Sequence, residues 1–372
     1  MRRLLVAALA ALALVPSAHA AAPPVVARSY LVVNAATGEV LASQAAHERV
    51  PIASITKLMT VLVALERART GSQVVVDPRA DEVGESTVNL QAGERLPLSD
   101  LIKAALIQSA NDAAYAIAAG VGRGNVSSFV AAMNAKAAQL GLRDTHFVRP
   151  DGLDAAGHYS SAWDVTTLAR AAMRRPFVRS VVRERTDVIA GGRELATWND
   201  LLGSFPGLLG VKTGHTGDAG WCEVAAARGR GVTIYATILG SPTRAQRNSD
   251  LAALLRWGLS RYRVARVISA DRTYAQVATG YGREPLPLVA AGPAKRSVRI
   301  GRPLVERVVA AGAVESPVRA GSRLGTVRIF EGRRLVAERP LVAAHSVEKP
   351  GALARVRFYA RRAVSHAWGW VT

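Results

Sequence analysis

Three short motifs contain the residue types from which a nucleophilic site can be built. The first is Ser54-Ile55-Thr56-Lys57, in which a hydroxyl and an amine stand three residues apart. On a helix this spacing places both side chains on one face. A serine hydroxyl is a weak nucleophile at neutral pH, and an amine activates it only when burial or a nearby cation keeps the amine unprotonated. Ser54 is therefore the candidate nucleophile and Lys57 its candidate base.

The other two motifs supply polar groups and a fixed cation. Ser109-Ala110-Asn111 is the only S-x-N in the chain, and Lys212-Thr213-Gly214 is the only K-T-G. A cation at Lys212 beside the nucleophile would lower the pKa of Lys57 and attract a carboxylate. The small residue Gly214, next to a strand, would let a substrate backbone approach closely.

Several other kinds of site are excluded by residue types and spacing. A second S-x-x-K, Ser346-Val347-Glu348-Lys349, runs directly into Pro350, and we assign it no role. No serine has glycine at both flanking positions, as a G-x-S-x-G nucleophile elbow requires. The seven histidines show no paired metal spacing, so we expect neither a metal nor another cofactor. The single cysteine, Cys222, excludes an internal disulfide, and we expect it to be a small buried apolar residue.

In this order, the three motifs resemble those of the low-molecular-mass penicillin-binding proteins that are serine-type D-alanyl-D-alanine carboxypeptidases. The resemblance is strong over residues 25–262, whereas residues 263–372 match such enzymes only in layout. Further matches are Pro51-Ile52-Ala53, Pro150-Asp151-Gly152-Leu153, His158-Tyr159-Ser160-Ser161 and the sequence K-T-G-H-T-G from Lys212 to Gly217.

The resemblance implies a mechanism. A peptidoglycan stem peptide ending in D-Ala-D-Ala would lie antiparallel along the strand that carries the K-T-G motif. Ser54 would attack the penultimate D-Ala carbonyl while Lys57 takes its proton, and β-lactams would acylate the same serine. The backbone N–H groups of Ser54 and His215 would form the oxyanion hole. Ser109 and Asn111 would relay the leaving-group proton and hold the substrate amide, before water hydrolyses the acyl-enzyme.

The same resemblance implies a binding site for the terminal carboxylate. Lys212, Thr213 and the adjoining Gly214 would form it together with an arginine from the helix that follows the last strands. Arg247 is the candidate and Arg244 its rival. A guanidinium suits this role because its planar fork binds a carboxylate through two hydrogen bonds.

Three other functions remain open. A D,D-endopeptidase that cuts peptidoglycan cross-links would share the site, but such relatives usually lack the region after Val264. A class A β-lactamase normally has Asp in the middle of S-D-N, where this chain has Ala110, and we find no Glu to place as its deacylating base. A non-catalytic envelope scaffold is the third, and the intact motifs argue against it.

The elements that must position these motifs indicate an α+β fold. Two outer blocks of strands enclose a run of helices, and successive strands joined by tight turns pair antiparallel. We therefore expect a penicillin-binding/β-lactamase-like transpeptidase domain, an antiparallel sheet with helices. The expected strands are Tyr30 to Val33, Val40 to Ala42, Leu208 to Thr213, Gly220 to Ala227 and Val232 to Leu239. The expected helices are Ser54 to Arg69, Ser99 to Ala119, Val126 to Leu140, Ala162 to Met173 and Arg244 to Tyr262.

The chain divides into four predicted regions: a signal peptide at 1–20, a D,D-peptidase domain at 21–262, a small β-rich domain at 263–350 and a helix at 351–372. The signal peptide is indicated by Arg2 and Arg3, the apolar stretch Leu4 to Val15 and the small residues up to Ala20. Export predicts a location in the periplasm or cell envelope. The net charge is +20, but 42 of the 48 cations are Arg spread along the chain. This distribution and export argue against nucleic acid as a partner.

The C-terminal region is predicted to lie on a membrane. Its apolar residues recur at three and four, as on one face of a helix. Arginines and the rings of Trp368 and Trp370 favour an anionic headgroup region, so we expect peripheral binding to the outer face of the cytoplasmic membrane. A helix packed on the β-rich domain is the alternative. The apolar face consists of Leu353, Val356, Ala360, Val364, Ala367 and Val371.

Overall fold

The computed structural model describes residues 9–11, 21–281, 283–353 and 355–360. Its contacts divide the chain into two units. One unit is Ala20–Arg261, which contains all three motifs. The other consists of Met1–His19 and Tyr262–Thr372.

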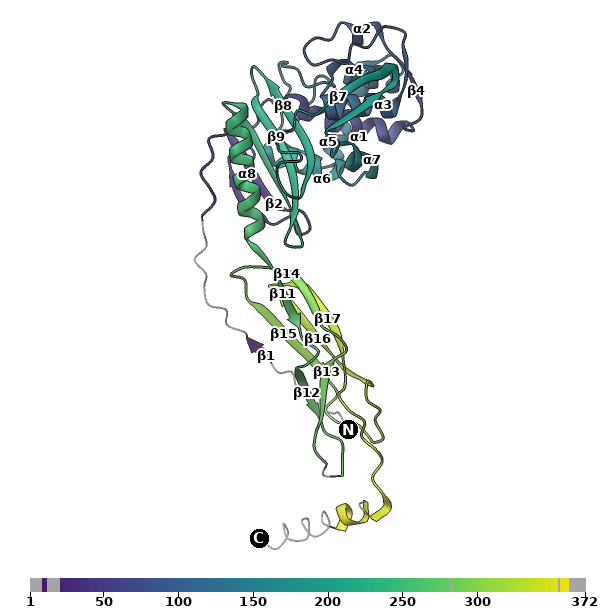
Figure 1. The fold of residues 1–372 in the computed structure, drawn as a ribbon, viewed down its shortest axis with the longest axis vertical. Helices are drawn as coiled ribbons and strands as arrows, with labels where there is room; N and C mark the ends of the chain where they lie inside the picture. Colours follow the sequence, from purple (N-terminus) through teal and green to yellow (C-terminus); the bar gives the residue numbers. More distant parts are fainter. Residues whose placement is uncertain (1–8, 12–20, 282, 354, 361–372) are drawn as a thin grey trace. The chain divides into compact units, whose positions relative to one another are not determined.

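A five-stranded antiparallel sheet forms the centre of the first unit, in the order β3-β2-β10-β9-β8 (Figure 1). Gly38, at φ +71°, lies in the turn between the first two strands, as expected for a tight hairpin. Because β8 is last in the order, its outer side has no partner strand in the described sheet. The strands are β2 (Ser29–Asn34), β3 (Val40–Gln44), β8 (Leu208–Thr216), β9 (Gly220–Gly229) and β10 (Val232–Ser241).

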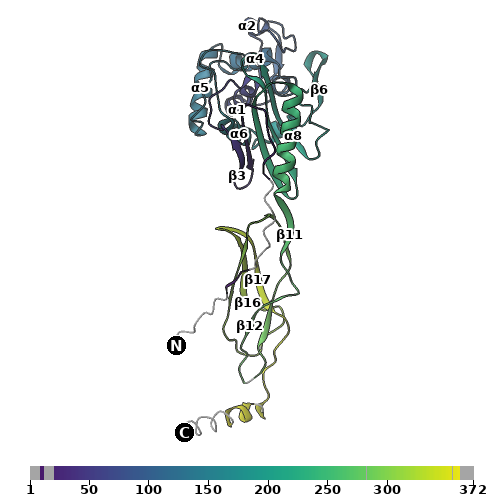
Figure 2. The ribbon, with the colours of Figure 1, turned by 90° about the vertical axis from the view of Figure 1, so that its left-hand side faces the viewer.

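Two helices cover opposite faces of this sheet (Figure 2). Leu31 and Val33 of β2 belong to the same buried cluster as the apolar side chains of α6 (Ala162–Ala172). Val32, which points to the other face, lies against Gly258 of α8 (Arg244–Ser260). The predicted helix at 162–173 is confirmed, and the one at 244–262 ends at Ser260 because β11 begins at Tyr262.

Helix α1, whose first eight residues are all buried, lies among several other helices of this unit. Helices α4, α5 and α6 all contact α1. The predicted helix at 126–140 is confirmed as α5. These helices are α1 (Lys57–Arg67), α2 (Pro78–Asp81), α3 (Leu98–Lys103), α4 (Asn111–Val121), α5 (Val126–Gln139) and α7 (Pro176–Val181). The sequence did not indicate two short strand pairs, β4 (Gln73–Val75) with β5 (Arg95–Pro97) and β6 (Thr186–Ile189) with β7 (Arg193–Ala196).

The second unit is rich in strands, as expected. A six-stranded sheet has the order β1-β15-β16-β17-β13-β12, and β11 pairs with β14. Its core is built from apolar residues such as Leu288, Val327 and Leu341. The strands are β1 (Leu9–Ala11), β11 (Tyr262–Ile268), β12 (Thr273–Val277), β13 (Leu286–Ala290), β14 (Ala294–Arg299), β15 (Leu304–Ala310), β16 (Arg323–Glu331) and β17 (Arg334–Ala343).

The predicted signal peptide and C-terminal helix fall largely outside the described residues. Residues 352–353 and 355–360 are helical, and Leu353 and Val356 are 83% and 67% exposed. The apolar positions Val364, Ala367 and Val371 lie beyond the described part, as do both tryptophans. Within the described ranges, no helix is both long and apolar enough to span a bilayer.

Candidate active site

The Ser54 hydroxyl and the Lys57 amine meet at the start of α1. Ser54 lies in a single 3-10 turn, η1 (Ala53–Thr56), and Lys57 is the first residue of the helix. The expected spacing on one turn is therefore present, with Lys57 Nζ 2.7 Å from Ser54 Oγ. Ser54 is half-buried and open to a cavity, whereas Lys57 is completely buried.

Uncharged oxygens surround the Lys57 amine. Besides Ser54, it contacts Oδ1 of Asn111 and the backbone carbonyl of Asp151, both at 2.7 Å. Burial lowers the pKa of Lys57 from 10.5 to about 7, although the carboxylates of Asp151, Asp112 and Glu85 oppose the change. Near neutral pH a large fraction of Lys57 is unprotonated. Its lone pair can then face Ser54 while its two N–H groups bind the other two oxygens.

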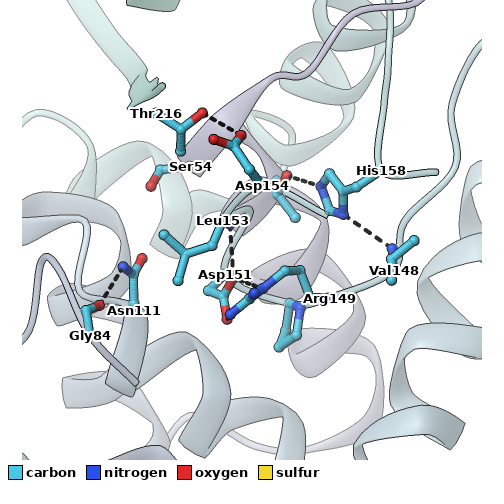
Figure 3. A network of polar contacts seen from close by, with 12 residues as sticks. Ser54, Gly84, Asn111, Val148, Arg149, Asp151, Leu153, Asp154, His158 and Thr216 are labelled. Carbon is cyan, nitrogen blue, oxygen red and sulfur yellow. Dashed lines mark hydrogen bonds and ion pairs between the residues drawn. The ribbon is translucent and has the colours of Figure 1, made fainter. Parts of the chain in front are cut away.

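A loop after α5 fixes the Asp151 carbonyl beside Lys57 (Figure 3). Arg149 Nε lies 2.6 Å from Asp151 Oδ1, and the Leu153 N–H donates to the same oxygen at 2.9 Å. Gly152 has φ +87°, and a Cβ at this position would lie 2.1 Å from the Ala53 carbonyl oxygen. Only glycine therefore lets this loop approach the turn that carries Ser54.

His158 belongs to the scaffold rather than to the reacting groups. The Val148 N–H donates to Nδ1 at 3.1 Å, so the ring proton sits on Nε2, which contacts Thr56 Oγ1 at 2.8 Å. Burial lowers the pKa of His158 to about 4, which keeps the ring neutral. The next segment ends at Ser161, whose hydroxyl accepts from the Asp164 N–H and caps α6.

The second motif interrupts a helix that the sequence predicts to be continuous from Ser99 to Ala119; that prediction is wrong. After α3, one turn of π-helix, η2 (Ala104–Gln108), ends at Ser109, which has φ +66°. A left-handed residue cannot continue a right-handed helix, so α4 begins anew at Asn111. The Asn111 side chain points back toward Lys57 and donates from Nδ2 to the Gly84 carbonyl at 3.0 Å (Figure 3).

The third motif lies within β8, not at its end, because the strand continues to Thr216. Lys212 is buried, and its Nζ donates to Ser109 Oγ at 2.8 Å and to the Thr213 carbonyl at 2.9 Å. Burial lowers the pKa of Lys212 well below its ordinary value, and the nearby cations of Lys57 and Arg247 lower it further. At Gly214, a Cβ would lie 3.1 Å from the Ser54 nitrogen, so the missing side chain lets the turn with Ser54 approach the strand.

All three motifs contribute to a single cavity of about 220 Å³. Its lining includes Ser54, Ser109, Asn111, Thr213, Gly214, His215 and Arg247. Sequence reasoning missed Glu85, Ser86, Trp198 and Trp221, which also line it. The Trp221 ring packs against His215 with 4.0 Å between ring centroids and a tilt of 30°, and the two residues pair across β8 and β9, so the predicted hairpin could have found Trp221. Glu85 and Trp198 lie in segments without a periodic pattern.

The two candidate arginines are placed differently. Arg247 is 1% exposed, lines the cavity and has its Cζ 5.6 Å from the centre of the Trp221 ring. Arg244 is more exposed, and its Nε and Nη2 both donate to the Asp200 carboxylate. It does not belong to the residues that line the cavity. The geometry therefore favours Arg247 for binding an anion in this cavity.

The far end of β8 is tied to the loop after Gly152. Thr216 Oγ1 donates to Asp154 Oδ1 at 2.6 Å (Figure 3), and the Asp218 N–H donates to Asp154 Oδ2 at 3.1 Å. Cys222 is completely buried, as expected, and burial raises the pKa of its thiol to about 12. At that pKa the thiol is not ionised near neutral pH and is a poor nucleophile.

Comparisons with known proteins agree on one kind of enzyme. A family model described as D-alanyl-D-alanine carboxypeptidase matches residues 17–243. The carboxypeptidase DacF of Bacillus subtilis is 29% identical over 338 residues, covering 87% of each chain. DacC of Escherichia coli is 30% identical over 363 residues, 92% of this chain and 90% of its own. The crystal structure of penicillin binding protein 5 from Haemophilus influenzae superposes with a TM-score of 0.65 at 25% identity, covering 88% of this chain and 99% of that one.

Proposed function

The chain belongs to the D-alanyl-D-alanine carboxypeptidase family and is a serine-type carboxypeptidase, and from this premise we propose that Ser54 forms its acyl-enzyme. The substrate class is peptidoglycan peptide ending in D-Ala-D-Ala. One observation carries the assignment of Ser54. A completely buried amine, with a pKa of about 7, lies 2.7 Å from its hydroxyl.

In the first step Lys57 acts as general base. Its unprotonated amine takes the proton of Ser54 Oγ as that oxygen attacks the carbonyl carbon of the penultimate D-Ala. The Asn111 amide oxygen and the Asp151 carbonyl hold the amine in place throughout, because they bind its other two protons. The tetrahedral oxyanion is stabilised by the backbone N–H groups of Ser54 and His215, which lie on the turn and strand that approach at Gly214.

The second step expels the terminal D-Ala. Its nitrogen must be protonated as the C–N bond breaks, and Ser109, whose hydroxyl contacts Lys212 at 2.8 Å, is suited to relay the proton that Lys57 took from Ser54, which leaves Lys57 unprotonated again. The terminal carboxylate lies toward Thr213 and Arg247 at the cationic end of the cavity. Water then attacks the ester on Ser54, Lys57 takes a proton from the water and returns it to Ser54 Oγ as the ester bond breaks, and the shortened peptide leaves.

Covalent labelling tests the assignment of Ser54. Wild-type protein incubated with labelled penicillin should carry one label, and Ser54→Ala should carry none. Ser346→Ala is the matched control, because Ser346 belongs to the other S-x-x-K of the chain and should be dispensable. Label on Ser346, or persistent labelling of Ser54→Ala, would overturn the proposal.

Product analysis separates the remaining alternatives. Mass measurement of defined muropeptides should show loss of one D-Ala from pentapeptides. A split cross-linked dimer would instead indicate D,D-endopeptidase activity. Rapid turnover of penicillin would indicate a β-lactamase. If the correctly folded protein forms no product at all, a non-catalytic scaffold is the remaining alternative.

The location of the enzyme is proposed from its substrate and its first residues. Peptidoglycan lies outside the cytoplasm, and the basic, apolar and small-residue order of residues 1–20 is that of a signal peptide. The mature enzyme is therefore exported to the periplasm or cell envelope. The basic C-terminal region holds it on the anionic outer face of the cytoplasmic membrane.

A further inference from the structure

Glu223 is a completely buried carboxylate to which the reaction above gives no role. It lies in β9, directly opposite Thr213 of the K-T-G strand and Ile238 of β10. Neither of its carboxylate oxygens has a hydrogen-bond partner in the described part of the chain. A buried carboxylate without hydrogen bonds is costly for a fold, so charges nearby have to compensate it.

The nearest compensating charge is Arg247, whose Nε lies 3.1 Å from Glu223 Oε2. Both side chains are almost fully buried, so the solvent screens their attraction little. The other charged groups that act on Glu223 are the cations of Lys212 and Arg244 and the carboxylate of Asp200. Glu223 therefore lies among three cations and one competing anion.

Arg247 is held on several sides. Nε donates to Asn248 Oδ1 at 3.0 Å and lies 3.1 Å from Glu223 Oε2, while Nη2 donates to the same Asn248 oxygen at 2.6 Å and lies 3.3 Å from Asp200 Oδ2. The Trp221 ring lies beneath the guanidinium. Among the described residues Nη1 has no hydrogen-bond partner, and Arg247 lines the cavity. A guanidinium anchored at Nε and Nη2 keeps its remaining N–H groups for a ligand.

We propose that Glu223 is a positioning residue for the substrate carboxylate: it anchors Arg247 at the cationic end of the cavity and balances the two buried cations, Arg247 and Lys212. The inference rests on the proposed function, in which these cations bind the terminal carboxylate. Glu223 itself contacts no reacting atom.

A pH effect follows for Lys212. Burial and the cations of Lys57 and Arg247 lower the pKa of Lys212, and Glu223 is the group that raises it. Burial raises the pKa of Glu223 itself to about 7, so this carboxyl group is fully ionised only at alkaline pH. Without that charge Lys212 loses its proton at lower pH. The alkaline limb of kcat/KM then moves toward neutrality.

Kinetics of Glu223→Gln and Glu223→Leu test the proposal on the full chain. The substrates are a peptide ending in D-Ala-D-Ala and the same peptide amidated at its C-terminus. For the free acid we expect KM to rise about tenfold with kcat changed less than about twofold, because ground-state positioning is lost rather than the nucleophile. The amide should be unaffected, and Glu223→Asp should restore part of the loss.

Glu306→Gln is the matched control, because Glu306 is also a buried carboxylate paired with an arginine, Arg272, but lies in the second unit. The KM and the pH profile of Glu306→Gln should equal those of the wild type. Thermal unfolding of each variant separates folding from positioning. Glu223→Leu keeps the test valid if Glu223→Gln fails to fold, since replacing a buried charge by an apolar group is often neutral or stabilising.

Two results would overturn the inference. One is an unchanged KM and alkaline limb in folded Glu223→Gln or Glu223→Leu. The other is an equal loss on the acid and the amide, which would indicate a merely structural role. Failure of the proposed function looks different, because the wild type itself would then release no D-Ala from the free acid.

Discussion

Lys57 and Lys212 are two buried amines of one site that serve different purposes. Each contacts only uncharged oxygens, and burial lowers the pKa of both. For Lys57 this is what a general base requires. For Lys212 the arriving substrate carboxylate would favour the protonated form again, because an opposite charge raises the pKa of an amine. Substrate binding would thus complete the charge of its own binding site.

The rate of acylation should follow the protonation of Lys57. The amine is protonated below its pKa of about 7 and cannot accept the Ser54 proton, so kcat/KM should fall about tenfold per pH unit on the acid side. Above pH 7 the Lys57 amine is free and no longer limits the rate, which falls again only where Lys212 loses its proton. Second-order rates of penicillin acylation between pH 5 and 8 measure this. A flat profile, or a midpoint near the ordinary lysine value, would contradict the assignment of Lys57 as base.

Removal of the Arg247 guanidinium should act selectively on substrates with a free carboxylate. Losing a charge-assisted contact costs about 1.5 to 3 kcal/mol, or roughly tenfold to a hundredfold in kcat/KM. Arg247→Ala should therefore slow peptides with a free C-terminus far more than amidated peptides. Arg244→Ala should have the smaller effect, because Arg244 is not part of the cavity lining, although the Asp200 carboxylate that it binds also contacts Arg247. The opposite ranking would transfer the carboxylate to Arg244.

At the scale of elements, the sequence predicts those whose pattern is local. The helices α1, α5 and α6 have apolar residues at three and four, and strong caps such as Ser161 mark where they start. The break at Ser109 could not be foreseen, because the apolar pattern runs on through it without Gly or Pro. Contacts distant in sequence decide it, since the Asn111 N–H bonds the Ser86 carbonyl at 2.6 Å.

The residues of the site likewise divide into those that a local pattern reveals and those that it does not. The three motifs could be placed from residue types and from the family resemblance. Glu85 and Trp198 could not, because they lie near the motifs only after the chain has folded. The short strands β4 to β7 were missed because three or four residues are too few to show an alternating pattern.

Gly152 should be among the least replaceable positions outside the motifs. In Gly152→Ala the new Cβ would lie 2.1 Å from the Ala53 carbonyl oxygen, so the loop must withdraw and take the Asp151 carbonyl away from Lys57. A misplacement of this kind lowers activity on the order of a hundredfold. The rate of penicillin acylation and the midpoint temperature of thermal unfolding should both be lower than in the wild type.

Gly141→Ala is the matched control for this change. Gly141 also has positive φ, +72°, but a Cβ there would meet no atom within 4 Å. The free energy of unfolding of Gly141→Ala should fall by only roughly 1 to 2 kcal/mol, which is what a left-handed conformation costs an L-residue. Its acylation by penicillin should be normal. Equal effects of the two substitutions would show that the backbone conformation, and not the close approach to Ala53, is what matters at Gly152.

At the scale of the whole molecule, charge is distributed unevenly. The region from Arg261 onward has 21 Lys and Arg against seven Asp and Glu, which accounts for 14 of the 20 net positive charges. Some of these cations are paired, as Arg272 is with Glu306 and Arg334 with Glu331. The excess remains available to an anionic surface, and long-range attraction of this kind weakens with salt.

Truncation after Pro350 should release the protein from anionic vesicles and leave penicillin acylation intact. Each arginine near an anionic surface contributes about 1 kcal/mol, and the removed segment contains four of them. Co-sedimentation with vesicles of anionic and of zwitterionic lipid, at low and high salt, measures the effect. If the truncated protein still sediments with anionic vesicles, or if it unfolds, the C-terminal segment is not the membrane contact.

The open edge of β8 exposes the enzyme to self-association as well as to substrate. An unpaired strand edge is a template for any extended chain, including the same edge of a second molecule. We therefore expect concentrated free enzyme to lose activity through edge-to-edge dimers, and a bound β-lactam to protect it during storage.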